Sequence, residues 1–384
     1  MEWILYRAFS CETGFLTKRF RATCEVIMFH CRLALVCVLA GFVWHTPALA
    51  WGHPGHQLVG SLADELIMGT NASKKVAAIL GPQIRSLQTA ATWPDCVRDV
   101  QRSSSGTFKY NDHSMYHSPA CVPFEGAAER KRMEEFARRN WTNCPGEQGK
   151  PASECHKQFH FADVAVQHRD YKRTWAGTSD LDVVSAIQAA IGVLRNGPPA
   201  TAPFSIKTKK EALFMLAHFV GDLHQPLHVG AIYLADDGSV VNPDSGSIPL
   251  AEVMQTRGGN KLEIGVSNLH SEWDDIPSSI TLNGLKTGPG KKRRQAMIAA
   301  ARAVEGMTGD LTLWPVTWAS DTVTVAQNSF TGLRFSRKGV LKSGNWVVQF
   351  NDQTGYDNAK ERVQQQQLVK AAANLAQLLK AIWP

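Results

Sequence analysis

Two histidine–aspartate pairs in this sequence have a four-residue spacing. His218 and Asp222 form the first pair, and His270 and Asp274 form the second. With about 3.6 residues per turn, residues four apart share one face of a helix, so each pair can direct both side chains at one point. A lone pair of this kind is often an ordinary hydrogen bond on a helix surface. Two pairs, with His228 shortly after the first, favour a metal site, because imidazole and carboxylate suit Zn²⁺ without a thiol.

Amphipathic helices are the elements that must position these residues. Apolar residues recur at helical spacing in the segments 59–66, 182–195, 213–220 and 368–382. Ser179 and Asp182 stand at capping-box spacing before the second of these segments, which predicts where its helix begins. Segments within 229–262 and 339–350 are typical of hairpins attached to a helical body. The sequence therefore predicts a mainly α fold, a single helical domain with short β-hairpin excursions.

Composition and the N-terminal segment bound the class of protein. The 384 residues are 44% hydrophobic and 20% charged, which excludes disordered, collagen-like and coiled-coil classes. The apolar run 33–43 is too short to span a bilayer but typical of a signal-peptide core, and a small-x-small motif ends at Ala50. We expect residues 1–50 to be a signal peptide, with Met28 as a second candidate start, and the mature protein to be secreted or periplasmic. A retained single membrane anchor is the alternative.

Cysteines support the expected export. Four of them follow the cleavage point, namely Cys96, Cys121, Cys144 and Cys155. An even number in an exported protein predicts two disulfides, with three possible pairings that the sequence does not separate. Reactive or metal-binding thiols are the alternative, which the lack of a CxxC pair disfavours.

Further motifs form an ordered set along the chain. They are WGHPGH at 51–56, ATWPDCVR at 91–98, HFAD at 160–163, HFVGDLHQPLH at 218–228 and NLHSEWD at 268–274. In this order they resemble the zinc-dependent single-strand-specific nucleases and 3′-nucleotidases. Each motif is modest by itself, but the ordered set is specific, and it spans the chain from Trp51 to Asp274. The C-terminal segment resembles the closing helix of that family less specifically.

The resemblance implies a mainly helical fold of the phospholipase C and zinc nuclease type, extending over 51–384 and holding three Zn²⁺ per chain in a cleft. Trp51 would act through its α-amino group and carbonyl oxygen, which requires cleavage directly before it. The ligands that the resemblance implies for the first ion are Asp95, His160, His218 and Asp222. The second ion would be held by Trp51, His56 and a bridging Asp222. The third would be held by His228, His270 and Asp274.

The same resemblance implies a reaction and its substrates. Asp95 and Asp222 would be catalytic through the ions that they hold, and Arg98 would contact the phosphate. Phe161 would stack on a nucleobase, and Asp163 would hydrogen-bond the base edge or help hold the nucleophile. The implied partners are nucleotides and single-stranded DNA and RNA, cleaved to 5′-phosphate products. We expect a monomer with no obligate protein partner and, after signal cleavage, no membrane partner. Core packing for Phe161 and a surface ion pair for Arg98 are the alternatives.

One segment departs from the family pattern. The chain between Asp95 and His160 is much longer than in the fungal members and contains three cysteines. We therefore expect a disulfide-tied insertion at about 101–158 that lines the cleft, and it makes His113 and His117 rivals of His160 for the ligand position.

Other candidates have simpler interpretations. His224 lies off the helical face of Asp222, so we expect it to have a structural role or to support a ligand rather than to bind metal directly. His53 matches no family position and is expected to be solvated or hydrogen-bonded. Gly258-Gly259-Asn260 resembles a family turn at the cleft margin, although most such triplets are simply turns. The basic run 291–294 is expected to begin a helix rather than to guide a polynucleotide.

Two other classes of protein compete with the nuclease. A zinc-dependent phospholipase C shares the three-ion plan, but there the last ligand is Glu and the first His is farther from the N-terminal Trp. Asp274 and the short spacing from Trp51 to His56 favour the nuclease. A non-catalytic protein in which zinc only braces helices is the third candidate, disfavoured because too few donors are present to close every coordination sphere.

Overall fold

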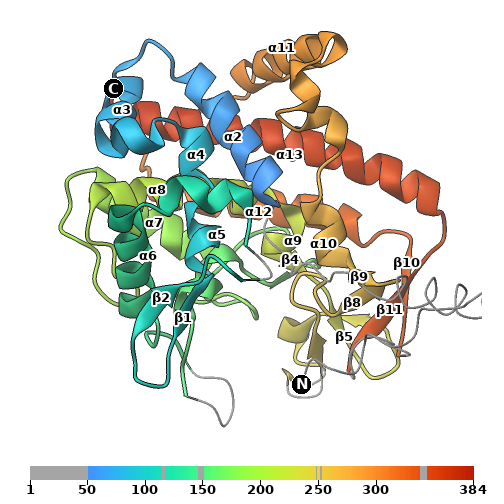
Figure 1. Cartoon of the computed structure of the whole chain (residues 1–384). Helices are drawn as coiled ribbons and strands as arrows, with labels where there is room; N and C mark the ends of the chain where they lie inside the picture. The colour runs from blue at the N-terminus through green and yellow to red at the C-terminus, as the bar shows by residue number, and fades with distance from the viewer. Residues whose placement is uncertain (1–50, 115–116, 146–150, 248, 251–252, 338–343) are drawn as a thin grey trace, which may run out of the picture. The chain divides into compact units, whose positions relative to one another are not determined.

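Helix α8, Lys209–His224, lies at the centre of the architecture (Figure 1). The structure is a computed structural model that describes residues 51–114, 117–145, 151–247, 249–250, 253–337 and 344–384. The expected signal peptide, residues 1–50, lies outside the described residues. The described residues belong to one compact unit.

Helix α8 is buried on every side rather than on one face. Residues from Glu211 to His224 are all buried, since four helices pack around them: α2 (His53–Leu66), α7 (Val183–Leu194), α12 (Trp314–Ser329) and α13 (Gln353–Ile382). The sequence predicted an apolar stripe within 213–220, but apolar residues occupy nearly the whole circumference, which is typical of a central helix. His218 and Asp222 are therefore held deep in the protein.

The other helices follow the predicted periodicity. Asp182, rather than Ser179, caps the 183–194 helix, because its carboxylate accepts hydrogen bonds from the backbone N–H of Ser185 at 3.1 Å and of Ser179 at 3.2 Å. The α-helices besides α8 are α2 (His53–Leu66), α3 (Asn71–Ile84), α4 (Leu87–Ala90), α5 (Trp93–Val97), α6 (Ala127–Arg139), α7 (Val183–Leu194), α9 (Pro226–Val229), α10 (Leu269–Asp274), α11 (Gly288–Arg302), α12 (Trp314–Ser329) and α13 (Gln353–Ile382). The 3₁₀ helices are η1 (Pro119–Phe124), η2 (Cys155–His160), η3 (Pro243–Ser245), η5 (Ser278–Ile280) and η6 (Gly284–Lys286).

Small sheets are attached to this helical body, as the sequence predicted. Their orders are β1-β2, β3-β4, β6-β5-β7 and β10-β11-β8-β9. Of the hairpin predicted at 339–350, residues up to 343 lie outside the described residues; Trp346–Phe350 is a strand that pairs antiparallel with Leu333–Ser336, which precedes the predicted segment, and parallel with the strand at 262–264. The strands are β1 (Val100–Arg102), β2 (Phe108–Tyr110), β3 (Val164–Ala165), β4 (Gly230–Ala231), β5 (Tyr233–Leu234), β6 (Val240–Val241), β7 (Met254–Gln255), β8 (Leu262–Ile264), β9 (Ser267–Asn268), β10 (Leu333–Ser336) and β11 (Trp346–Phe350).

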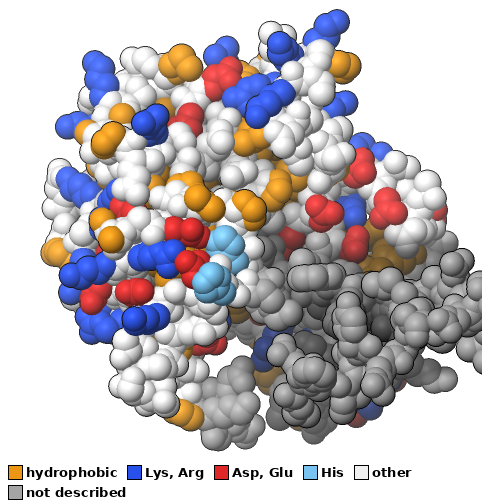
Figure 2. Space-filling model, in the orientation of Figure 1, with side chains coloured by type: hydrophobic (Ala, Val, Ile, Leu, Met, Phe, Trp, Pro, Cys, Tyr) orange, Lys and Arg blue, Asp and Glu red, His pale blue; other side chains and the backbone are white. Residues whose placement is uncertain are grey.

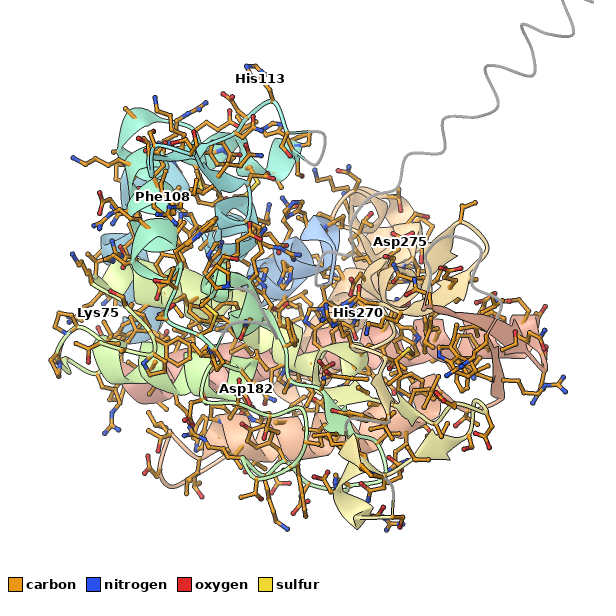
Figure 3. The ribbon with its side chains drawn as sticks, turned by 90° about the horizontal axis from the view of Figure 1, so that it is seen from below. Lys75, Phe108, His113, Asp182, His270 and Asp275 are labelled. Atoms are coloured by element: carbon orange, nitrogen blue, oxygen red, sulfur yellow. A yellow bond between two sulfur atoms is a disulfide. The ribbon has the colours of Figure 1, made fainter. Side chains whose placement is uncertain are left out.

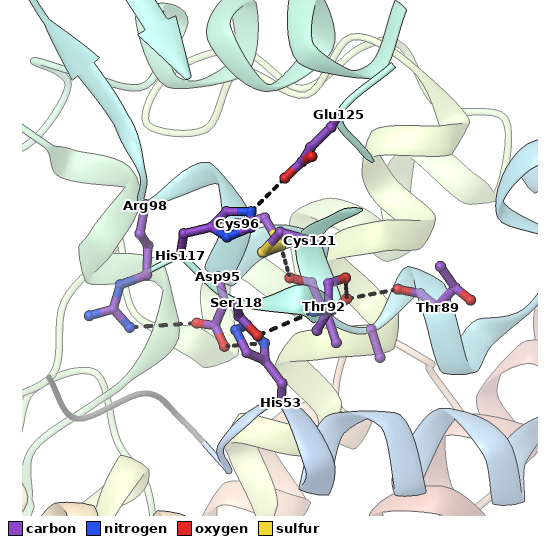
Figure 4. The surroundings of a disulfide bond; sticks show 12 residues. His53, Thr89, Thr92, Asp95, Cys96, Arg98, His117, Ser118, Cys121 and Glu125 are labelled. Carbon is purple, nitrogen blue, oxygen red and sulfur yellow. Dashed lines mark hydrogen bonds and ion pairs between the residues drawn. A yellow bond between two sulfur atoms is a disulfide. The ribbon is translucent and has the colours of Figure 1, made fainter. Parts of the chain in front are cut away.

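Two disulfides stabilise the 101–158 segment: one ties it to α5, and the other lies within it. Cys96 pairs with Cys121, and Cys144 pairs with Cys155, which selects one of the three pairings left open by the sequence. The first bond joins α5 to η1 (Figure 4), and the second closes a short loop at the start of η2. Both bonds therefore end on a segment that carries a candidate ligand, Asp95 in α5 and His160 in η2.

Surface charges alternate in sign over α6. Figure 2 shows Lys and Arg side chains mixed with Asp and Glu in that part of the surface. Arg132 pairs with Glu129 at 3.0 Å and Arg138 with Glu135 at 2.7 Å, so much of this charge is neutralised locally. No helix among the described residues is both long and apolar enough to cross a membrane.

Candidate metal centre and cleft

Ligand-type side chains from six elements converge beside α8. Proline-containing first turns begin α2, α5 and α9, and each of these short turns places a ligand-type residue next to the central helix. The side chains come from α2 (His56), α5 (Asp95), η2 (His160), α8 (His218 and Asp222), α9 (His228) and α10 (His270 and Asp274).

The first cluster joins His160, His218 and Asp222. Asp222 Oδ2 lies 3.1 Å from His160 Nδ1 and 3.1 Å from His218 Nε2. The two ring nitrogens are 3.0 Å apart. Two imidazoles and a carboxylate thus direct their donor atoms at one small volume, which is the arrangement that a zinc ion requires.

The second cluster joins His56, Asp95 and His218. The rings of His56 and His218 stack with centroids 3.7 Å apart, and Asp95 Oδ1 lies 3.8 Å from His218 Nε2. Asp222 reaches this cluster as well, because its Oδ1 is 3.1 Å from His56 Nε2. Asp222 therefore directs one carboxylate oxygen at each of the two clusters. His56 lies close to Asp95 as well as to Asp222.

The third cluster joins His228, His270 and Asp274. The Nε2 atoms of the two histidines are 3.0 Å apart, and Asp274 Oδ2 is 3.5 Å from that of His270. Gln225 fixes the carboxylate by donating from its amide nitrogen to Asp274 Oδ1 at 2.6 Å. The predicted shared face of His270 and Asp274 is confirmed by α10.

Backbone carbonyls set the orientation of three of the imidazoles. His218 Nδ1 is 2.6 Å from the Ala91 oxygen, and His228 Nδ1 is 2.7 Å from the His160 oxygen. His270 Nδ1 lies 2.8 Å from the Gly258 oxygen. Each Nδ1 therefore donates to the backbone, which leaves the Nε2 lone pair pointing into the cluster, the usual arrangement for histidines that bind metal.

Buried polar atoms without hydrogen-bond partners mark the centre as a cation site. They include both ring nitrogens of His56, both carboxylate oxygens of Asp95, Asp222 Oδ1 and Asp274 Oδ2. Buried polar groups normally have partners, so this concentration of lone pairs fits bound cations. The donors are imidazole nitrogens and carboxylate oxygens, which fit zinc. Among the described residues, three buried His/Asp clusters could therefore hold metal ions.

The pKa values of these groups are consistent with a role as metal ligands. Burial lowers the pKa of His56 and of His160 to about 4, so both imidazoles are neutral near pH 7. Burial acts to raise the pKa of Asp95, but the neighbouring His218, His53 and Arg98 lower it to about 2. Burial raises the pKa of Asp274 well above its usual value, and the negative charges of other carboxylates add to this effect. A cation would stabilise the charged form of that carboxylate.

Trp51 packs against α8, next to His56 and Asp222. Its side chain is fully buried, and its indole N–H donates to the Gly221 oxygen at 2.8 Å, one residue before Asp222. A Cβ on Gly221 would lie 2.8 Å from His56 Nδ1, so glycine is required for this close packing. The structure thus brings Trp51 beside His56 and Asp222, the residues with which the resemblance grouped it.

A cleft of about 290 Å³ opens onto the centre. Phe161 is 37% exposed at this cleft, which excludes core packing for its ring. Arg98 lies 3.5 Å from Asp95 Oδ1, so its ion pair belongs to the centre rather than to the outer surface. The lining residues are Arg98, Lys157, His160, Phe161, Asp163, Leu227, His228, Arg257, Asn260 and His270.

Asp163 is buried in the wall of this cleft. Gln255 donates to its carboxylate at 2.8 Å, and Tyr233 O–H donates to its backbone oxygen at 2.8 Å. Burial raises the pKa of the Asp163 carboxyl to about 7. A carboxyl group with such a pKa is partly protonated near neutral pH, so it can accept a hydrogen bond from a bound base or donate one to it.

Histidines outside the predicted ligand set have other partners. His113 is exposed and lies at the edge of the ribbon, away from His270 (Figure 3), and His117 pairs with Glu125 (Figure 4). Only His160 of these three candidates reaches the clusters. His224 hydrogen-bonds to Val220 and Asn374, as expected for a structural residue. His53, which was expected to be solvated or hydrogen-bonded, is buried, with its Nδ1 3.7 Å from Asp95 Oδ2 (Figure 4).

Several residues of the site have no clear signal in the sequence. Gln225 lies within a motif and Lys157 shortly before one, but no spacing indicates their contacts. Gly258 was expected to form a turn, and its oxygen also orients His270; a Cβ there would lie 2.0 Å from the Leu227 oxygen. Its φ of +55° also favours glycine. The presence of Gly258 in the segment before the candidate ligand His270 is the sequence signal that could have indicated this role.

Replacing Gly258 with alanine is expected to disturb the third cluster. The new Cβ would clash with the backbone at Leu227 and displace the carbonyl that orients His270. We expect metal content to fall and unfolding stability to drop by more than about 2 kcal/mol. The control is Gly265→Ala, where φ is +57° but nothing lies within 4 Å, so only backbone strain acts. Equal effects of the two variants on metal content would contradict this role for Gly258.

The described residues define a mainly helical protein with a buried His/Asp metal centre. The family model described as S1/P1 Nuclease matches residues 51–140 and 139–384, so the chain belongs to the S1/P1 nuclease family. Two curated relatives from Arabidopsis thaliana show more distant similarity. Endonuclease 4 is 34% identical over 110 residues, which cover 27% of this chain and 28% of that protein. Endonuclease 3 is 29% identical over 122 residues, which cover 31% of this chain and 34% of that protein. The aligned segments span a minor part of these relatives' length.

Proposed function

We propose that the mature chain is an exported zinc-dependent phosphodiesterase that hydrolyses single-stranded DNA and RNA to 5′-phosphate products and removes 3′-phosphate from nucleotides. One observation carries this proposal: His160, His228 and His270, which belong to the metal-type clusters, line the same cleft that exposes Phe161. A centre that only braced helices would not need an exposed aromatic ring beside it. The endonuclease names of the two plant relatives support the same reaction class.

Each group of the site has a role in this proposal. Zinc held by the three clusters and by Trp51 would supply Lewis acidity toward the phosphate and lower the pKa of water to roughly 7. Arg98 would offer its guanidinium to the phosphate. Phe161 would stack on a base, which requires that the base be unpaired and so favours single strands. Asp163 would hydrogen-bond that base or help hold the nucleophile.

Export is part of the proposal. We propose that residues 1–50 are removed, that the protein is secreted or periplasmic, and that it acts as a monomer. The two disulfides support an oxidising compartment, because such bonds persist outside the cytosol.

The test is a metal analysis combined with parallel assays. We expect the purified chain beginning at Trp51 to bind about three zinc ions, since three clusters are present, and to lose activity in a chelator. It should cleave single-stranded DNA and RNA faster than duplex DNA, and release phosphate from 3′-AMP.

Two results would overturn the proposal. A content of at most one zinc per chain would exclude the three-ion centre. Hydrolysis of phosphatidylcholine without cleavage of nucleic acid would assign the centre to a phospholipase C.

A further inference from the structure

Three cations surround the cleft, and they come from separate segments. Arg98 lies beside the centre, 3.5 Å from Asp95. Lys157 and Arg257 also line the cleft but lie on η2 and on the turn before β8. Asp163 is the single acidic residue among the lining residues; Gln255 donates a hydrogen bond to its carboxylate, and the positive charge of Arg257 acts on it as well. Three cations and one carboxyl group therefore line the cleft, so the balance of charge in its wall is positive.

Lys157 is held on the same side of η2 as His160. Side chains three residues apart eclipse one another in a 3₁₀ helix, so the position of His160 fixes that of Lys157. The Cys144–Cys155 disulfide anchors the first residue of this helix. Lys157 pairs with Glu154 at 2.6 Å, but the two side chains are 34% and 43% exposed. Such an exposed pair contributes little to stability, so a phosphate can replace the carboxylate at little cost.

Arg257 is held by a turn that also serves the metal centre. Its backbone oxygen accepts hydrogen bonds from the backbone and side-chain nitrogens of Asn260 at 3.0 and 2.9 Å. The next residue, Gly258, supplies the oxygen that orients His270. The Arg257 side chain is exposed at the cleft. Lys157 and Arg257 thus lie on segments that also position histidines of the metal centre, namely His160 in η2 and, through Gly258, His270.

We propose that Lys157 and Arg257 bind the phosphates that flank the scissile phosphate, so that these two cations strengthen the binding of an oligonucleotide but not that of a mononucleotide. This inference rests on the proposed nuclease function and assigns two residues of this chain to the binding of its substrate. Arg98, next to Asp95, is placed for the scissile phosphate, which leaves the other two cations of the cleft for the neighbouring phosphates along the strand. The 101–158 segment then acts on specificity through Lys157, which it carries at its end.

The test compares salt dependence of binding for ligands of different length. Fluorescence anisotropy measures binding of a labelled phosphorothioate tetranucleotide to the zinc-loaded protein over a range of KCl concentrations. Competition gives the affinity for 3′-AMP. We expect Lys157→Gln and Arg257→Gln each to weaken tetranucleotide binding about 3- to 10-fold and to reduce the salt slope by roughly 0.7. Binding of 3′-AMP should change less than about twofold.

Matched variants separate this role from a general loss of charge or fold. Lys292→Gln removes an exposed cation of α11, and it should leave the salt slope unchanged. Lys157→Arg should restore it. An equal loss of affinity for 3′-AMP and the tetranucleotide, or an unchanged salt slope in both glutamine variants, would overturn the inference. If the slopes change as expected but the wild-type protein cleaves no nucleic acid, the proposed function fails and the binding site stands.

Discussion

Replacing Asp222 with asparagine is expected to lower phosphodiesterase activity at least about 100-fold, beyond the 10- to 100-fold cost of outer-shell changes. Its carboxylate lies 3.1 Å from His56, His160 and His218, and it is fully buried. An amide of the same shape keeps the packing but removes the negative charge shared by two clusters. Zinc analysis should show loss of metal from these clusters, while the third cluster keeps its ion because Asp274 supplies its carboxylate.

A matched variant tests whether another His–Asp pair, partly buried and outside the clusters, would matter equally. Asp244 lies 2.7 Å from His168, outside the three clusters, and Asp244→Asn should leave zinc content and activity close to those of the wild type. Thermal unfolding of both variants checks that they remain folded. Full zinc content and full activity in Asp222→Asn would show that this carboxylate does not join two ions.

Retaining Ala50 before Trp51 is expected to abolish most activity, again at least about 100-fold. Trp51 packs against Gly221, next to Asp222 on α8, and the proposed function assigns its α-amino group to the metal centre. A terminal amine has a lone pair to give to a metal once it is deprotonated, whereas an amide nitrogen has none to offer. Proteins beginning at Ala50 and at Trp51 are compared for zinc content and activity, and the longer one should hold about one ion less.

One extra residue at the other end of the chain is the control. The Pro384 oxygen accepts a hydrogen bond from Asn71 at 3.0 Å, at an exposed position near α3 (Figure 1). An added C-terminal alanine should therefore leave zinc content and activity unchanged. If the protein beginning at Ala50 is as active as that beginning at Trp51, the α-amino ligand is wrong and the cleavage point has no catalytic role.

Local features of the fold could be predicted because they depend on neighbours along the chain. The helical spacing of apolar residues located α2, α7 and α13. Ser179 and Asp182 together predicted the start of α7, and Asp182 is its cap. The parallel pairing of β11 with β8 was not predicted, since strand pairing depends on tertiary contacts and β8 is far away in sequence.

The residues of the candidate site also divide into those that local spacing predicts and those that it does not. The His218–Asp222 and His270–Asp274 pairs follow from helical periodicity alone. Asp95 and His160 were expected through resemblance to a family, since nothing in their local spacing joins them to α8. The bond between Cys96 and Cys121 could not be chosen among three pairings until the positions of α5 and η1 were known.

The sequence by itself determined a mainly helical protein with two His/Asp pairs and an ordered set of motifs, because periodicity and motif order are properties of the chain. Only the tertiary structure decided that His160 rather than His113 joins Asp222, that Gly258 orients His270, and that Lys157 and Arg257 share one cleft. These contacts link residues distant in sequence, and they form only when burial of α8 brings the surrounding helices and turns together.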